Sequence, residues 1–518
     1  MKKWVSILAT ASMAAGVLSA CAGGGGSAEP EAPAGDGGTP AAPAADSGPK
    51  EQTYSMLVES HPSWPYDENW VVWDYLKEKT GATFEVQTPS GEIEDALSLT
   101  VASGEMPDIM YTLDKKLADK YGMQGALVNI LDYVDQMPNF KAWMEQYPTE
   151  TAGAIAADGK MYIFPNQGIS ETNRNIWMFR QDIFEKHGLS APTTYDELYA
   201  VLKELKAQYP DSYPFAFRFG KNLQILRNLS ANFGTNEDFY LDVETNEWKY
   251  GPIEEEYKTL LGWLNKFYEE GLMPPDWLTV DVKQWQDLVS TNRTFVTVDY
   301  IGRIDNFNIP LRKDNPAFNM AFMAPPAGAA GGKQQNPYTH FKISGMMVAS
   351  TSEKIEDIMK VMDYYFSEEG KELLSWGKEG EIHETVDGKK KFIETYADVG
   401  DLRKKTGLGT NGAYTWFDYD SHLSLASPEL QGAYVEARKY DMPLDPEPPM
   451  DEAESETMAT TYQAILKHRE ENVSKFILGE RDLADWNDFV EEQKGLGIDQ
   501  VLAVYKQAYD RMQANGAK

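Results

Sequence analysis

The chain has 518 residues, of which 42% are hydrophobic and 12% aromatic, and its 81 acidic and 48 basic side chains give a net charge of −33. This balance excludes nucleic acid as a general partner, because the protein would repel a phosphate backbone. It also disfavours polyanionic ligands unless arginines gather locally. A folded body of roughly 470 residues exceeds what one hydrophobic core usually supports, so we expect two lobes.

The N-terminus has the layout of an export signal. Two lysines precede an apolar run over residues 4–18, which is too short to span a membrane comfortably. The run ends in Leu18-Ser19-Ala20-Cys21, which resembles the bacterial lipobox, in which the cysteine receives a diacylglycerol. We therefore expect a signal peptide over residues 1–20 and lipidation of Cys21. The alternative is an ordinary cleaved signal that happens to be followed by a cysteine.

A tether and a disulfide-free body follow. Cys21 is the only cysteine, so the fold must be held by its hydrophobic core. Residues 22–50 consist largely of Ala, Gly, Pro, Asp and Glu, with no aromatic or large aliphatic side chain. Such a segment cannot bury enough apolar surface to become ordered. We expect residues 21–50 to be a lipidated flexible tether, and no later stretch has the apolar length of a membrane span.

From residue 52 onward, short apolar runs alternate with amphipathic helices, which is typical of βα units. The apolar runs predict strands at 54–58, 83–87, 108–111, 294–298, 320–323 and 346–349. The helical periodicities predict helices at 70–79, from Thr194, at 254–270 and at 355–366. The helix from Thr194 begins with a capping box that includes Glu197, and its apolar face is expected to pack against a sheet.

Seven segments carry a family resemblance by their order and spacing rather than by any single motif. They are Met106-Pro-Asp-Ile-Met-Tyr111, Asp158-Gly-Lys-Met-Tyr-Ile-Phe-Pro165, the run from Trp177 to Leu198, Phe295-Val-Thr-Val-Asp299, Phe322-Met-Ala-Pro-Pro326, Ser344-Gly-Met-Met-Val-Ala349 and Glu369-Gly-Lys-Glu-Leu-Leu-Ser-Trp-Gly377. Together they resemble the extracellular solute-binding proteins of ABC importers. The similar group is the sugar-binding one, with the maltose-type receptors and the long lipoprotein receptors of Paenibacillus-like bacteria.

The resemblance implies a fold and its boundaries. The fold class is α/β, a two-lobed periplasmic-binding-protein-like fold with three inter-lobe crossings and a central ligand cleft that closes by hinge motion. The crossings are expected near 164–171, 340–345 and 441–450. Lobe one would then comprise 51–168 plus 344–440, and lobe two 169–343 plus 441–518.

Aromatic loops are the first candidates for a sugar site. Sugar rings present apolar faces fringed by hydroxyls, so they suit flat aromatic side chains beside Asp, Asn, Arg or Glu. Trp64 and Tyr66 follow the first expected strand in a proline-fixed loop, although such a tryptophan could simply cap a core. Tyr111 and Asp114 follow the third strand, where the resemblance implies an aromatic side chain and an acid on the sugar.

The crossing and the second lobe supply further candidates. Glu171, Asn173 and Trp177 flank the expected first crossing. Tyr300 and Arg303 leave a strand at its carboxyl end, and the resemblance implies a sugar-contacting position there.

Other tryptophans are divided between site and core. Trp376 and Glu379 close a helix at a turn that faces the cleft in the family, with a tryptophan lid over the core as an equal alternative. The helical spacing of Trp70 and Trp73 favours the core, and Trp285 is also expected to pack. The arginines that could gather locally are Arg174, Arg180, Arg218, Arg227 and Arg303.

The sequence offers little evidence for enzymatic or metal chemistry. The six histidines are scattered, and no Gly-x-Ser-x-Gly elbow or phosphate-binding glycine loop occurs. Because the chain has many Asp and Glu residues, the sequence does not exclude a pair of carboxylates that could act as in a glycosidase. Many long relatives carry a calcium loop after the capping-box helix, but residues 206–214 are too short and too poor in carboxylates for one. We expect no metal and no cofactor. The acidic stretch 236–247 is predicted to be a solvated hairpin.

These observations predict a non-enzymatic receptor on the outer face of the cell membrane. It would capture a carbohydrate, most simply an oligosaccharide, by lobe closure and pass it to the transmembrane permease subunits of an ABC importer. We expect a monomer attached to the membrane through its lipid, and the charge favours neutral glycans over uronates. Two alternatives stay open: a cell-surface enzyme acting on polysaccharides, and a signalling lipoprotein with the receptor fold.

Overall fold

The computed structural model describes residues 50–218, 220, 225–328, 332–338, 341–342 and 344–516. The expected signal peptide, the lipidation site Cys21 and the tether up to residue 49 lie outside the described residues. The described residues form one structural unit. Within the described part of the chain, no helix has both the length and the apolar character needed to cross a membrane.

The first sheet contains four strands in the order β12-β3-β1-β2. Its strands are β1 (Gln52–Leu57), β2 (Ala82–Gln87), β3 (Ile109–Thr112) and β12 (Gly345–Val348). β1 runs parallel to β2 and β3, whereas β12 pairs antiparallel with β3. β3 and β12 are buried throughout, as expected of strands covered on both faces. The predicted strands at these four places are confirmed with small shifts of their ends.

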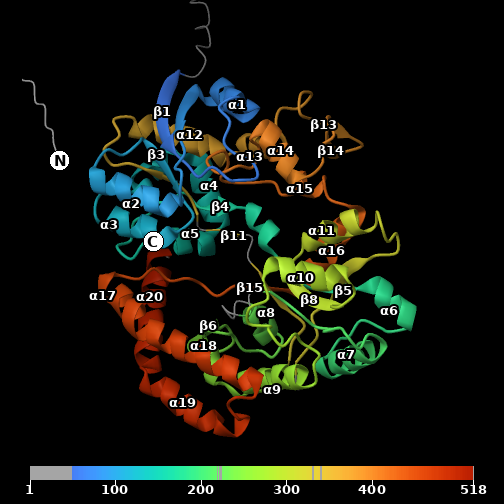
Figure 1. Cartoon of the computed structure of the whole chain (residues 1–518). Helices are drawn as coiled ribbons and strands as arrows, with labels where there is room; N and C mark the ends of the chain where they lie inside the picture. The colour runs from blue at the N-terminus through green and yellow to red at the C-terminus, as the bar shows by residue number, and fades with distance from the viewer. Residues whose placement is uncertain are drawn as a thin grey trace, which may run out of the picture. The chain divides into compact units, whose positions relative to one another are not determined.

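Helices from two separate stretches of the chain cover this sheet (Figure 1). They are α1 (Val71–Thr80), α2 (Ile93–Ser103), α3 (Lys115–Met123), α4 (Pro138–Gln146), α5 (Pro148–Ala154), α12 (Ile355–Tyr365), α13 (Glu368–Trp376) and α14 (Val399–Thr406). The short helix α15 (Asp420–Leu423) instead places Leu423 against another cluster. α1 ends at Gly81 in the left-handed region, as its sequence predicts. The predicted core positions of Trp70 and Trp73 are confirmed, because Trp70 is buried and Trp73 packs against the same cluster.

The second sheet has β5 (Asn175–Arg180) between β8 (Val296–Tyr300) and β9 (Met320–Met323), and both pairings are antiparallel. Side chains of β5 alternate between two clusters, as the two-residue period of a strand requires. Ile176 and Met178 join Trp285 and Phe307 in one cluster. Trp177 joins the other cluster, which the long helices cover. The prediction that Trp285 packs in the core is therefore confirmed.

The second core includes the helices α6 (Gln181–His187), α7 (Tyr195–Gln208), α8 (Leu226–Ala231), α9 (Glu255–Glu269), α10 (Val282–Ser290) and α11 (Arg303–Leu311). Two of these helices were predicted, and α7 begins and α9 begins and ends close to the expected residues. The Thr194 hydroxyl caps α7 by accepting from the amide of Glu197 at 3.2 Å. The predicted capping box is only half formed, because the Glu197 carboxylate accepts instead from the amide of Thr193 at 2.7 Å.

The C-terminal part of the chain adds α16 (Pro428–Ala437), α17 (Glu452–Thr457), α18 (Gln463–Leu478), α19 (Trp486–Gly495) and α20 (Ile498–Gly516). The expected boundary at 440 assigns α16 to lobe one, but its apolar side chains pack in the second core with Trp285 and Phe307. Ser427 also donates to the Asp305 carboxylate of α11 through its amide at 2.9 Å. The third passage between the two cores therefore precedes α16.

Two hairpins complete the fold. β6 (Phe239–Asp242) and β7 (Glu247–Tyr250) pair antiparallel, which confirms the hairpin predicted for the acidic stretch. Its turn contains Asn246 in the left-handed region, and Lys249 pairs with Asp242 at 2.5 Å. The other hairpin joins β13 (His383–Val386) and β14 (Lys389–Phe392).

Candidate functional site

A segment of seven residues, 168–174, joins the two cores. Just before it, β4 (Asn166–Gln167) pairs with β11 (Phe341–Lys342), and the amide of Gln167 donates to the carbonyl of Thr415 at 2.8 Å. Just after it, Asn175 enters the second sheet opposite Tyr300. The first expected crossing therefore runs along a turn of 3₁₀ helix over Ile169–Asn173.

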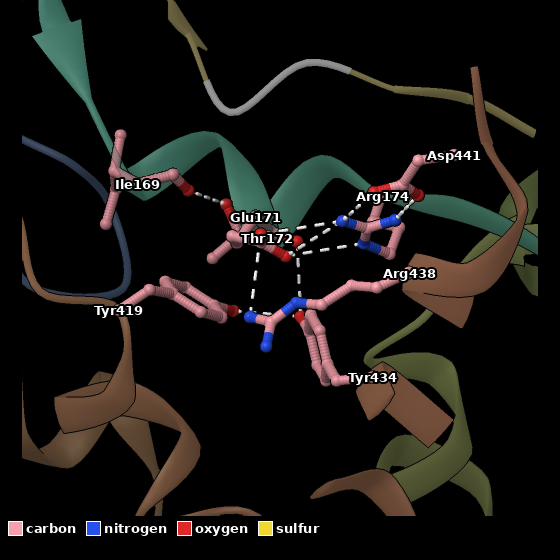
Figure 2. A network of polar contacts seen from close by, with 8 residues as sticks. All are labelled: Ile169, Glu171, Thr172, Arg174, Tyr419, Tyr434, Arg438 and Asp441. Atoms are coloured by element: carbon pink, nitrogen blue, oxygen red, sulfur yellow. Dashed lines mark hydrogen bonds and ion pairs between the residues drawn. The ribbon is translucent and has the colours of Figure 1, made fainter. Parts of the chain in front are cut away.

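Arg174 is the centre of a polar network on this segment (Figure 2). Its side chain is 1% exposed, pairs with the Asp441 carboxylate and lies 3.3 Å from a carboxylate oxygen of Glu171. Its guanidinium also stacks 3.6 Å above the ring of Tyr338, which belongs to β10 (Asn336–Tyr338). Burial acts to lower the pKa of Arg174, but the hydrogen bond to Asp441 and the charge of Glu171 outweigh it and raise that pKa.

The network continues through α16 and the loop before it. Arg438 approaches a Glu171 carboxylate oxygen at 3.6 Å. The Tyr434 hydroxyl donates to the backbone carbonyl of Glu171 at 3.2 Å and lies 3.0 Å from the Tyr419 hydroxyl (Figure 2). β10 also pairs with β15 (Asp441–Pro443) in parallel. Segments far apart in sequence are thus joined by paired charges around the buried Arg174 and Glu171, at the place where the chain passes between the cores.

The second core contributes a charged cluster at the carboxyl end of β8. Asp299 is 2% exposed and accepts hydrogen bonds from Arg218, at 2.9 Å from Nη2, and from Nε of Arg303 at 3.0 Å. Arg218 also stacks 5.4 Å from the ring centre of Tyr300. Tyr300 and Arg303 are only partly buried, so the aromatic side chain on Arg218 and the second arginine of this cluster are both partly accessible.

The first core contributes an aromatic and cationic stack in the loop after β1. The rings of His61 and Trp64 are stacked with centroids 3.7 Å apart. The Arg403 guanidinium of α14 lies 4.6 Å from the Trp64 ring centre. Tyr66 packs edge-on against Trp70 with ring centroids 5.5 Å apart. Burial, followed by the charge of Arg403, lowers the pKa of His61 and keeps that imidazole neutral at neutral pH.

Three of the expected ligand contacts lie inside the cores instead of at an opening. Tyr111 is 1% exposed, Trp177 is 0% exposed and Trp376 is 3% exposed. The Trp177 indole donates to Asn232 at 3.1 Å and its ring stacks on Phe215. The Trp376 indole donates to Asp418 at 2.8 Å, as expected of a tryptophan lid over the core. In this conformation none of the three side chains is exposed.

Three other expected residues are exposed and lie outside the polar network. Asp114 caps α3, where its carboxylate accepts from the amide of Lys116 at 2.9 Å. Asn173 is exposed on the crossing turn itself. Glu379 lies on a groove of about 440 Å³ beside α13, together with His383 and several lysines and glutamates. The five arginines that could have formed one cluster separate, and only Arg218 and Arg303 share a carboxylate.

Sequence reasoning missed most members of the polar network. The missed residues are Tyr338, Tyr419, Tyr434, Arg438 and Asp441, and Arg403 beside Trp64 was missed as well. Asp441 lies at the start of an expected crossing, and Glu171 and Arg174 have the spacing of an ion pair on one helical turn, so these two signals were available. The others reach the site only through tertiary packing.

No group of side chains in the described residues has the composition of a metal site. The structure contains two clusters that each combine an aromatic ring with an arginine, one in each core, and a crossing segment whose charges are paired. Such clusters suit a ligand with apolar faces and oxygen-rich edges.

Comparison with known proteins decides the family. Residues 65–372 match the family model of the bacterial extracellular solute-binding proteins. The chain belongs to this family. Its members are transport proteins that bind solutes outside the cell rather than enzymes.

Curated relatives are distant but cover most of the chain. The fructooligosaccharide ABC transporter substrate-binding protein FusA of Streptococcus pneumoniae is 21% identical over 90% of this chain and 91% of its own length. The polygalacturonan/rhamnogalacturonan-binding protein YtcQ of Bacillus subtilis is 22% identical over 81% of this chain and 84% of its own.

Solved structures confirm the fold class. The alginate-binding protein AlgQ2 is 24% identical, with a TM-score of 0.69 over 89% of this chain and 98% of that one. An HMO-binding solute-binding protein from Bifidobacterium longum infantis is 18% identical, with a TM-score of 0.72 over 89% of this chain and 99% of that one. This solute-binding protein thus has the two-lobed periplasmic-binding-protein fold predicted from its sequence.

Proposed function

We propose that this solute-binding protein captures an oligosaccharide between its two lobes and delivers it to the transmembrane permease subunits of an ABC importer. One observation carries the proposal. An aromatic side chain beside an arginine occurs in each core, as Trp64 with Arg403 and as Tyr300 with Arg218, and the crossing segment around Arg174 links the two cores. The names of the relatives, which include a fructooligosaccharide and a polygalacturonan receptor, support a carbohydrate ligand.

Lobe closure provides the mechanism. A ligand that contacts both lobes favours the closed state by the difference between its affinities for the closed and open states. Since α16 packs on the second core, we place lobe one at about 51–168 plus 344–427 and lobe two at about 169–343 plus 428–516. The paired charges at the crossings would keep the passages in register while the lobes move.

The expected ligand contacts take different parts in this proposal. Trp64, Tyr66, Tyr300 and Arg303 would contact the sugar directly, with Glu171 and Asn173 at the crossing between them. Tyr111, Trp177 and Trp376 would position these contacts from within the cores. Asp114 and Glu379 would lie at the margin of the site.

Calorimetric titration across a panel of oligosaccharides tests the function. At least one member should bind, and Trp64→Ala and Tyr300→Ala should each weaken it about tenfold, which corresponds to about 1.4 kcal/mol. The control is Trp263→Ala, which removes a half-buried tryptophan of α9 that packs on Tyr195. Silence across the panel would refute the carbohydrate proposal, and turnover of any member would favour the enzyme alternative.

We also propose that the mature protein begins at Cys21, is held by lipid on the outer face of the cell membrane and is monomeric. The pattern of charge, apolar run, lipobox and tether supports the anchor. Cells expressing the full chain should incorporate a labelled fatty acid such as palmitate into the protein, and Cys21→Ser should abolish the label and release the protein from membranes. Light scattering of the residue 50–518 body should give the mass of one chain.

A further inference from the structure

Arg403 differs from every other buried arginine in the described part of the chain. Five arginines are buried there, and Arg403 is 9% exposed. The other four each pair with a carboxylate, namely Arg174 with Asp441, Arg180 with Asp182, Arg218 with Asp299 and Arg469 with Asp238. No carboxylate of the described residues lies within 4.0 Å of the Arg403 guanidinium, and its Nε has no hydrogen-bond partner.

The side chains shown to interact electrostatically with this guanidinium are tyrosines and histidines. Three tyrosines act on Arg403 electrostatically, from β3 and from the loop before α15: Tyr111, Tyr414 and Tyr419. Two histidines are also close enough to feel its charge, namely His61 and His422. Burial, followed by the charge of Arg403, lowers the pKa of both histidines, so neither adds a charge at neutral pH.

An unpaired guanidinium in such surroundings is costly for the free protein. Arginine keeps its proton in proteins, so burial cannot neutralise it as it can a lysine. The contact with the Trp64 ring at 4.6 Å offsets part of the desolvation cost of the guanidinium. A ring face, however, does not accept the hydrogen bonds that the guanidinium N–H groups can donate in their plane. An incoming anionic oxygen group would supply the missing partner.

The position of Arg403 indicates that the anionic group would belong to the bound saccharide. Trp64 stands in the loop after β1, at the part of the first lobe where we propose that a sugar ring stacks. Tyr419, which acts on Arg403, also reaches the crossing network through its hydroxyl contact with Tyr434 at 3.0 Å. The guanidinium therefore lies between the proposed sugar platform and the crossing network.

We infer that Arg403 binds an anionic oxygen group on the saccharide, a uronate carboxylate or a sulfate ester, while the adjacent Trp64 contacts the sugar face. The inference rests on the proposed function and deepens it by naming an acidic saccharide. The net negative charge of the protein favoured a neutral glycan, and the inference replaces that expectation. At contact distance, the attraction between Arg403 and an anionic group is stronger than the repulsion from acidic residues spread over the surface.

The first test compares matched ligands on the wild-type body. Calorimetry would be run with a short oligogalacturonide, with the same oligosaccharide methyl-esterified, and with a sulfated neutral oligosaccharide beside its unsulfated parent. We expect an acidic form to bind at least tenfold more tightly than its neutral counterpart, with an affinity that falls as salt is added. Preference for the carboxylate pair or for the sulfate pair identifies the group. Equal affinity within both pairs would overturn the inference.

The second test changes the arginine. Arg403→Gln should abolish the preference for the acidic ligand, and Arg403→Lys should keep part of it. The control Arg293→Gln removes an exposed arginine that pairs with Asp287. Arg403→Gln should also leave the unfolding midpoint of the ligand-free protein unchanged or raised, because an unpaired buried charge is removed. A preference that survives Arg403→Gln would overturn the inference.

The outcomes of these tests distinguish the role of Arg403 from the carbohydrate-receptor function on which it rests. Binding of neutral saccharides alone would overturn the role of Arg403 and leave the carbohydrate receptor standing. Failure of every saccharide to bind would overturn both. If Arg403→Gln did not fold, the comparison of ester with acid on the wild-type protein would still decide.

Discussion

Replacing Arg174 with methionine should destabilise the protein more than any surface charge removal. Methionine keeps an unbranched apolar stem but lacks the guanidinium, so it removes the partner of Asp441 and Glu171 and the cation above Tyr338. Removing one member of a buried ion pair typically costs about 3–5 kcal/mol, because the remaining charge stays desolvated. Glu171 keeps Arg438 at 3.6 Å and the Asp441 side chain is 29% exposed, so we expect the lower end, about 3 kcal/mol.

Urea unfolding of the residue 50–518 body, followed by circular dichroism, measures this cost. The matched control is Lys506→Met, since Lys506 is 71% exposed and pairs with Asp510 on the surface. That variant should stay within about 0.5 kcal/mol of the wild type. A loss below about 1 kcal/mol for Arg174→Met would refute the reasoning. It would mean that backbone pairing and apolar packing hold the crossing and that the charges there contribute little.

Three further predictions concern single residues. Burial raises the pKa of Asp445 from 3.8 to about 6, so the stability gained from its protonation is complete below about pH 4 and lost as pH rises through about 6. Asp445→Asn should therefore gain up to about 3 kcal/mol relative to wild type between pH 4 and 7 in urea titrations, and an unchanged difference would contradict the shift. Gly168→Ala should cost at least about 2 kcal/mol, because φ is +95° and an added Cβ would overlap the Phe417 carbonyl oxygen, whereas Gly91→Ala, with open space around it, should be nearly neutral. Asp363→Ala should lower the free energy of unfolding by about 2 kcal/mol, because its carboxylate accepts from the amides of Asn139 and Phe140 at 2.9 Å; a normal midpoint would argue against capping of α4 by this residue.

Local sequence signals predicted the elements of both lobes well where burial follows a simple period. The stripe of α9 is an example, since Tyr257, Leu260, Leu261, Leu264 and Phe267 are all buried as its spacing predicts. The helices after residue 450 were not predicted, because their buried positions are diluted by charged residues on wide exposed faces. The lobe that receives α16 could not be predicted for a different reason. Apolar residues spaced for one helix face do not say which of two cores that face packs on.

The site was harder to predict than the fold, for a physical reason. Aromatic side chains serve both as sugar platforms and as core residues, so composition alone could not separate Trp64, which is half-buried, from Trp177, which is fully buried. The ion pairs that define the crossing join residues as far apart as Arg174 and Asp441, 267 positions along the chain. Only the folded structure shows which charges have partners and which, like Arg403, have none among the described residues.

The strand order of the first sheet sets a condition on how the chain reaches its native state. β12 pairs with β3 at the edge of this sheet, although in the sequence all three strands of the second sheet lie between them. Closing so long a loop makes the pairing slow relative to local structure. A chain interrupted before residue 345 would leave β3 with an unpaired edge, which is a template for aggregation. A shortened form that ends before β12 should therefore aggregate instead of giving an isolated first lobe. The first lobe should fold fully only when the chain up to β12 is present.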